Sequence, residues 1–232
     1  MRRSGAGGHR STALASVDRR AREKNETRER ILAAARDLFV REGVEAVSMR
    51  KIADAIEYTP AAIYTHFADK HALMLALCDS DFGLLREAMG EAAREPDPVE
   101  RLRRCGRAYI DFGFAHPHHY RFMFMTKFPA YDPKESPCEH GNPDEDAYAL
   151  LLDTVRACIG QGRFREEYRD VHVVTQACWG AVHGIVSLYL THGEDPWVNF
   201  VHARESAELL YSACIDGLLR RESAAGREGA KP

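Results

Sequence analysis

One short segment carries side chains suited to binding and has no apparent catalytic group. The segment IEYTPAAIYTHF, residues 56–67, contains two tyrosines, two threonines and one histidine, with one acidic residue and neither Lys nor Arg. Hydroxyl and imidazole groups form hydrogen bonds with phosphates and base edges, and small apolar groups contact bases. These residue types favour recognition over catalysis, so the elements that flank the segment decide what it recognises.

A second candidate cluster is HPHHY, residues 116–120, whose three histidines suggest metal binding or catalysis. Pro117 separates the first two histidines and no carboxylate stands nearby at helical spacing, so a metal site is not expected. The loop pair Cys138 and His140 offers two ligands, whereas structural zinc takes four. No nucleophile, base and orienting group stand at a motif spacing. We therefore expect no catalytic residue, no metal and no cofactor.

The residues before the first segment show helical periodicity. Residues 27–42 predict a helix, and Gly43 is suited to end it because glycine adopts the left-handed conformation. Ser48 is a favourable N-cap for a second, short helix. The apolar stripe of the first helix consists of Ile31, Ala34, Ala35, Leu38 and Phe39.

The segment itself predicts a tight turn followed by a third helix. Thr59 is a favourable N-cap and Pro60 a favourable first residue. Ile63 and Phe67 lie four residues apart and are expected to face inward. Two short helices joined by a tight turn and braced by a longer one form a helix-turn-helix. We therefore expect the third helix to face a DNA duplex, with phosphate contacts from Arg50, Lys51 and Lys70.

The stretch RERILAAARDLFVREGVEAVSMRKIADAIEYTPAAIYTHFADKHALMLAL, residues 28–77, resembles the DNA-binding domain of the TetR family of bacterial transcription regulators. The matching features are the A-A-x-x-L-F of the first helix, Gly43, Ser48-x-Arg50-x-Ile52-Ala53, Pro60-x-x-Ile63-Tyr64-x-His66-Phe67 and Lys70-x-x-Leu73. They cover about fifty residues at the right spacings, which makes the resemblance far more specific than a lone short motif.

The resemblance implies DNA contacts from the second and third helices and from the start of the fourth. The second helix would hold a phosphate at its N-terminus, since free N–H groups and the helix dipole favour an anion there. Pro60 is expected to be structural, while Ile52 and Ala53 are expected in the core. A mere cap and a solvated arginine are the alternative for Ser48 and Arg50. The candidate DNA-binding residues are Ser48, Arg50, Thr59, Pro60, Ala61, Ala62, Tyr64, Thr65, His66 and Lys70.

One departure from the family pattern lies in the turn. This chain has Glu57 where the family usually has glycine, and Tyr58 where a small apolar residue usually follows. A positive φ at Glu57 would cost about 1–2 kcal/mol relative to glycine.

The C-terminal half resembles a regulatory domain of the same family marked by Trp-x-x-x-His-Gly, here WGAVHG, residues 179–184. The segment HPHHYRFMF resembles the His-Pro-x-x-Tyr segment of that domain. Pockets in such domains are built from the same residue types as the core, so a core role is the alternative for each candidate. The candidate ligand-binding residues are Tyr109, Phe112, Tyr120, Phe124, Trp179 and His183.

The family resemblance further implies an all-helical homodimer on a palindromic double-stranded DNA operator, with half-sites about 34–36 Å apart. A small-molecule effector would release the DNA, since most members are repressors. The last two long helices would pair with their copies. Apolar residues expected on these helices are Val174, Trp179, Val182, Val186, Tyr189, Phe200, Leu209, Cys214 and Leu218.

Charge and composition divide the chain. Residues 1–26 hold seven Lys or Arg against three Asp or Glu, whereas residues 71–232 hold 18 against 25. A basic end suits a polyanion, and as an arm it can add minor-groove contacts. We expect a disordered basic tail at 1–24, the DNA-binding domain at 25–85, a helical regulatory and dimerisation domain at 86–221 and a polar tail at 222–232.

Composition also bears on location. No run of about 18 apolar residues suggests a membrane span, and the basic N-terminus lacks the apolar core of a secretory signal. The six cysteines form no Cys-x-x-Cys pair, which indicates reduced thiols. We therefore expect a cytoplasmic protein with no membrane partner.

Two other classes of function remain open. A helical scaffold or interaction protein with a vestigial helix-turn-helix would have no more DNA affinity than its basic tail supplies. A His-dependent hydrolase would use the HPHHY cluster.

Overall fold

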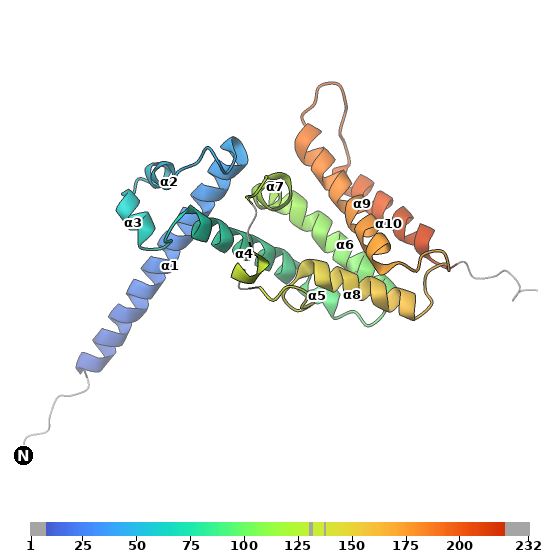
Figure 1. The fold of residues 1–232 in the computed structure, drawn as a ribbon, viewed down its shortest axis with the longest axis horizontal. Helices are drawn as coiled ribbons and strands as arrows, with labels where there is room; N and C mark the ends of the chain where they lie inside the picture. Colours follow the sequence, from blue (N-terminus) through green and yellow to red (C-terminus); the bar gives the residue numbers. More distant parts are fainter. Residues whose placement is uncertain (1–7, 130–131, 137, 221–232) are drawn as a thin grey trace, which may run out of the picture. The chain divides into compact units, whose positions relative to one another are not determined.

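Figure 1 shows the fold in a computed structural model, which describes residues 8–129, 132–136 and 138–220. The regular elements in these residues are helices, and the strand pairing present is one isolated antiparallel bridge between Phe164 and Leu219. The expected all-helical class is confirmed. The chain divides into two compact units, one of Met1–Leu77 with Thr126–Pro129 and the other of Cys78–Met125 with Ala130–Pro232.

The first unit, called the head here, contains α1 (Gly8–Glu42), α2 (Met49–Ala55), α3 (Pro60–Tyr64) and the first part of α4 (Lys70–Ala88). Each helix contributes apolar side chains to one core, since most helical stability in proteins comes from packing of an apolar face. The largest fully buried side chains of this core are Phe39, Ile31, Leu32, Ile52, Ile63, Leu73, Met74 and Leu77.

Helix α1 is longer than expected. The sequence predicted a disordered tail at 1–24 and a helix from about residue 27, but the helix begins at Gly8. Residues 9–42 contain no proline and are rich in Ala, Arg and Glu. Extending an existing helix through such residues costs little, because only nucleation is unfavourable. Residues 1–7, and the tail expected at 222–232, lie outside the described residues.

The second unit, called the body here, contains the rest of α4 together with α5 (Gly90–Ala93), α6 (Pro98–Ala115), α7 (Pro117–Met125), η1 (Pro133–Glu135), α8 (Ala147–Gly160), α9 (Val171–His192) and α10 (Ala203–Leu218). Aspartates begin three of these helices: Asp97, Asp146 and Asp170 each accept hydrogen bonds from two backbone N–H groups of the following turn. The two units divide after Leu77, inside α4, because one continuous helix supplies core residues to both. The domain boundary expected at 85/86 stays a prediction.

Helix α6 is central to the body and packs against α8, α9 and α10. Two of its glycines make the close approach possible. A Cβ on Gly106 would lie 1.8 Å from the Tyr211 ring of α10, and one on Gly113 would lie 2.5 Å from Cγ1 of Val186 on α9. Contacts this short exclude any side chain at those two positions. The last helix begins at Ala203, so Phe200, which the sequence analysis expected on one of the last two long helices, lies in the loop before it.

By length and composition, α9 is the one helix among the described residues that could cross a bilayer. Its Val174, Cys178, Val182 and Val186 are buried in the body. This packing accounts for part of its apolar composition, while other apolar side chains of α9, such as Val173 and Leu188, are exposed.

Candidate nucleic-acid interface and ligand pocket

Helix α3 is held by its two ends and by one buried side chain. Thr59 caps it, with Oγ1 accepting from the Ala62 N–H at 3.3 Å, and Pro60 is the first helical residue. Ile63 is fully buried and Phe67 nearly so. Tyr64 is anchored by these neighbours, yet its own side chain is 53% exposed. The inward positions predicted for Ile63 and Phe67 are confirmed.

The turn before α3 is left-handed at Glu57, with φ at 59°. The N–H of Tyr58 donates to the Ala53 carbonyl at 3.0 Å, which is the hydrogen bond that closes a helix after a left-handed residue. Tyr58 is fixed from α1: Arg30 donates to its hydroxyl at 3.2 Å, and the guanidinium carbon lies 5.1 Å from its ring centroid. The unusual Glu57-Tyr58 pair therefore keeps a helix-turn-helix geometry.

Helix α2 presents a cap and a free arginine side by side. Ser48 accepts from the Lys51 N–H at 3.2 Å, as predicted for an N-cap. Arg50 is 83% exposed, and its nearest carboxylate, on Asp54, is 3.9 Å away. An exposed ion pair at that distance contributes little, so the guanidinium is available to another anion.

Besides the caps Ser48 and Thr59, two of the candidate DNA-binding residues already donate hydrogen bonds within the head. Thr65 donates its hydroxyl to the Ala62 carbonyl at 2.7 Å. Lys70 donates to the carbonyls of Val44 and Val47 at 3.0 and 3.2 Å, so it ties the loop after α1 to the start of α4. His66 is half-buried and its Nδ1 has no hydrogen-bond partner among the described residues. Burial, helped by Lys24 and Arg28, lowers the pKa of His66 below its ordinary value.

These positions sort the ten candidates by exposure. Ser48, Arg50, Thr59, Ala61, Tyr64 and Thr65 are exposed, while Pro60, Ala62, His66 and Lys70 are half-buried. Lys70 keeps one N–H for a phosphate, since an ammonium has three donors and two are used within the head. DNA contact by each residue stays a prediction.

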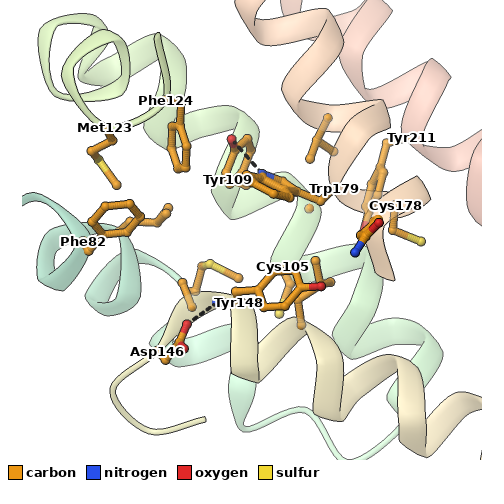
Figure 2. A pocket seen from close by; sticks show the side chains of 17 residues that line it. Phe82, Cys105, Tyr109, Met123, Phe124, Asp146, Tyr148, Cys178, Trp179 and Tyr211 are labelled. Atoms are coloured by element: carbon orange, nitrogen blue, oxygen red, sulfur yellow. Dashed lines mark hydrogen bonds between the residues drawn. The ribbon is translucent and has the colours of Figure 1, made fainter. Parts of the chain in front are cut away.

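The body contains a pocket of about 510 Å³, within the range of about 300–1,000 Å³ usual for small-molecule sites. Its lining comes from α4, α6, α7, α8, α9 and α10. Figure 2 shows Phe82 and Met123 on one side of the space, with Trp179 and Tyr211 on the other. Of the six residues predicted, Tyr109, Phe124 and Trp179 line it.

The remaining three predicted residues do not line this pocket. Phe112 is 3% exposed in the core beside His116, and Tyr120 is fully buried. His183 is not in the lining, and its Nδ1 lies 3.3 Å from the hydroxyl of the lining residue Tyr109. The sequence could not separate them, because core and lining residues alternate on the same helices. Phe82, Met123, Tyr148, Cys178 and Tyr211 also line the pocket and were missed.

A chain of hydrogen bonds links the pocket wall to His183. Trp179 Nε1 donates to the Tyr109 hydroxyl at 3.2 Å, Tyr109 donates to Tyr120 at 3.1 Å, and Tyr120 is 2.7 Å from His183 Nδ1. Burial lowers the pKa of His183 and raises the pKa of Tyr109 to about 12. Both groups are therefore neutral, and the chain is complete when His183 Nδ1 accepts the Tyr120 proton.

Two of the HPHHY histidines, His116 and His119, make ring contacts, whereas His118 is exposed. The His116 ring lies 5.2 Å from the Phe112 ring and 5.4 Å from the His119 ring. Over the part of the chain that the structure describes, no three His, Cys, Asp or Glu side chains gather where they could hold a metal ion.

The apolar residues predicted on α9 and α10 divide between the core and the surface. Val174, Val182 and Val186 are buried in the body and Leu218 nearly so, whereas Leu209 is exposed. A stripe at spacings of three and four runs along the exposed side of α9, and α10 carries a similar one. These stripes consist of Val173, Ala177, Gly180, Gly184 and Leu188 on α9 and of Leu209, Leu210, Ala213 and Gly217 on α10.

Comparison with known families gives two matches. Residues 31–77 match the family model described as bacterial regulatory proteins, tetR family. Residues 102–213 match the one described as a tetracyclin repressor-like C-terminal domain.

Individual proteins are similar over different shares of their lengths. The transcriptional activator FasR of Mycolicibacterium smegmatis is 32% identical over 45% of this chain and 48% of its own, so the match spans about half of that relative. The transcriptional repressor AcnR of Corynebacterium diphtheriae is 28% identical over 60% of this chain and 69% of its own. The TetR family regulator PfmR of Thermus thermophilus is 25% identical, with a TM-score of 0.64 over 82% of this chain and 99% of that one.

Proposed function

We propose that this chain, which belongs to the TetR family of bacterial regulatory proteins, is a sequence-specific DNA-binding transcriptional regulator. The observation that carries the proposal is that α3 is packed on one side and exposed on another. Its buried face is filled by Ile63, and its opposite side offers Tyr64 at 53% exposure beside small Ala61. A short helix that is fixed from behind and bears an exposed ring next to a small residue suits close approach to a groove.

The contacts divide by type. Arg50, together with the Ser48 hydroxyl, is placed to bind phosphates, which positions the protein but reads no sequence. Tyr64 and Thr59 are placed to meet base edges. His66, which is half-buried, has its Nε2 left for such a contact.

The proposed assembly is a homodimer on a palindromic operator. The stripes on α9 and α10 are rich in Gly and Ala, which let helices of a second copy approach closely, and they carry exposed apolar side chains such as Leu209 and Leu210. Exposed apolar faces of this size favour a partner surface. A twofold dimer would place two α3 helices in successive major grooves, about 34–36 Å apart.

The pocket in the body supports control by a small molecule. An effector bound there would release the DNA, which makes the protein a repressor in its unliganded state. The named relatives include both an activator and a repressor. The assignment as a repressor therefore rests on the family, most of whose members are repressors. A cytoplasmic location follows from access to DNA.

We propose no enzymatic activity. The hydrolase alternative would need the HPHHY histidines free, but the His116 ring packs against the rings of Phe112 and His119.

The test is selection of bound duplexes from a random DNA pool at fixed, near-physiological salt, since phosphate binding changes steeply with salt. A palindrome with half-sites one helical turn apart is expected. The control is Arg50→Glu with Tyr64→Ala, two exposed positions whose change leaves the core intact. Enrichment of no sequence by the folded protein, or equal enrichment by the control, would favour the scaffold alternative.

A further inference from the structure

We propose that the effector held in the body's pocket is an uncharged, mainly hydrocarbon molecule. That this molecule acts as an effector rests on the proposed function, whereas its binding is argued from the pocket alone.

The lining contains no Lys, Arg or His. Most of it is aromatic, aliphatic or sulfur-bearing, as Phe124, Leu151 and Met123 illustrate, and Asp146 is the one charged side chain. Arg101 and Arg86 act to lower the pKa of the lining thiol Cys105 against the larger effect of burial, but neither lines the pocket. Arg86 is turned to the loop before α8, where it donates to the Pro143 carbonyl at 3.0 Å. An anionic group in this pocket would therefore meet no positive side chain in the lining.

Three polar groups of the wall, on Trp179, Tyr109 and Tyr211, are already used by the protein. The Trp179 N–H donates to Tyr109, and the Tyr109 hydroxyl donates in turn to Tyr120. The Tyr211 hydroxyl donates to the Leu102 carbonyl at 2.8 Å. A ligand rich in hydrogen-bonding groups would have to break these bonds, and buried groups left without partners are costly.

Asp146 does not provide a free site for a cation. Its Oδ1 accepts from the N–H groups of Tyr148 and Ala149 at 2.8 and 3.2 Å, and its Oδ2 accepts from Gly141 at 3.1 Å. Three N–H donors and the positive end of α8 thus compensate its charge. The pocket offers an anion no counter-charge and a cation only a carboxylate that is already satisfied.

These features predict a strong preference among ligands that differ only in their head group. Burying an unpaired ion costs several kcal/mol, which corresponds to at least about 100-fold in affinity. The probes are 1-decanol, decanoate and decyltrimethylammonium, which share a ten-carbon chain and carry a neutral, a negative and a positive head.

Binding can be read in the pocket itself. The chain has two tryptophans, and Trp197 is 91% exposed outside the lining. A Trp197→Phe background leaves Trp179 as the reporter. Titration below the micelle concentration is expected to shift Trp179 fluorescence with decanol, and with each ion only at concentrations at least about 100-fold higher.

A matched pair of variants tests the reason for the preference. Gln176 is exposed and lies at the pocket's rim, so its replacement leaves the core intact. Gln176→Lys is expected to strengthen decanoate binding by about tenfold, since it supplies a charged hydrogen-bond donor. Gln176→Met is expected to change neither decanol nor decanoate binding.

The outcomes separate this inference from the proposed function, because no DNA is present in the titration. Wild-type affinity for decanoate or decyltrimethylammonium equal to that for decanol would overturn the inference. So would a folded protein whose Trp179 fluorescence fails to respond to decanol, or a lysine variant with no gain for decanoate. None of these results depends on whether the head binds an operator.

Discussion

Residue 57 is a non-glycine residue in a left-handed backbone conformation, and the fold tolerates the resulting strain. Glu57 has a φ of 59°, in a conformation that glycine adopts without strain. The strain is confined to one residue because the flanking helices are fixed independently. Ala53 and Ile63 are fully buried, and Arg30 holds Tyr58.

Replacing this glutamate by glycine should therefore stabilise the head. We expect Glu57→Gly to raise the free energy of unfolding by roughly 0.5–1 kcal/mol, as relief of about 1–2 kcal/mol of strain is offset in part by the entropy that glycine adds to the unfolded chain. Thermal unfolding followed by circular dichroism measures it. Glu57→Ala is the control, because it removes the charge and keeps the strain. An alanine variant as stable as the glycine variant would assign the gain to charge.

His183 makes stability depend on pH. Its pKa is lowered by burial, so between that lowered value and about 6.5 the unfolded chain binds a proton that the folded chain does not. Stability from neutral His183 is therefore complete above about pH 6.5 and is lost as pH falls below it. His183→Asn keeps an acceptor near Nδ1 but cannot titrate.

We expect the wild type to lose more stability than His183→Asn between pH 7.5 and pH 5.5. Urea unfolding at one protein concentration, followed by tryptophan fluorescence, reports on the body because Trp179 and Trp197 both lie there. His66 also has a lowered pKa, but it is present in both proteins and cancels in the difference. Equal losses for the two proteins would contradict a titrating role for His183.

At the scale of elements, the N-terminal half of α1 is distinctive. Residues 19–26 are exposed on all sides, and Figure 1 shows this end of the helix extending past α2 and α3 within the head. Arg20, Lys24 and Arg28 stand four apart on one face. The Arg28 guanidinium carbon lies 5.3 Å from the ring centroid of Phe67, next to His66. The basic face of α1 therefore continues up to the residues that follow α3.

We expect Arg20→Gln with Lys24→Gln to weaken DNA binding to a similar degree for all sequences, because phosphate contacts carry no base information. Loss of two phosphate contacts should lower the slope of log affinity against log salt by about 1.8. The measurement is fluorescence anisotropy at several salt concentrations. Arg19→Gln with Arg22→Gln removes the same charge from other faces of the helix. Equal slopes for the two double variants would show that only net charge matters.

At the scale of the whole molecule, the unpaired stripes of α9 and α10 predict the assembly. Leu209 is 72% exposed on α10, where it adds nothing to the core of a folded monomer. We expect Leu209→Glu to convert the dimer to monomers while the helical content is unchanged, since the buried core does not include this side chain. Analytical ultracentrifugation measures the change in mass.

Glu208→Gln, at the adjacent exposed position, is the control for that experiment. Its mass should stay that of the dimer. A Leu209→Glu protein that remains dimeric would place the interface elsewhere, and the operator would then not need the spacing proposed above.

The sequence by itself determined the head and the helical class. Caps such as Ser48 and Thr59, the stop at Gly43 and the four-residue spacing of Ile63 and Phe67 act between near neighbours in the chain. Such local signals can be read without knowledge of the fold, and the structure confirms the caps, the left-handed Gly43 and the buried pair. Local signals did not reveal that α1 extends to Gly8, because helix formers in a charged run resemble a solvated tail.

Only the tertiary structure decided the pocket and the faces of α9 and α10. The lining joins residues as far apart in sequence as Phe82 and Tyr211, and no spacing rule connects them. A helix such as α9 is apolar on more than one side, so which side meets the core depends on where its neighbours lie. That is why Tyr120 and Val186 lie in the core, whereas Tyr148 lines the pocket and Leu209 is on the surface.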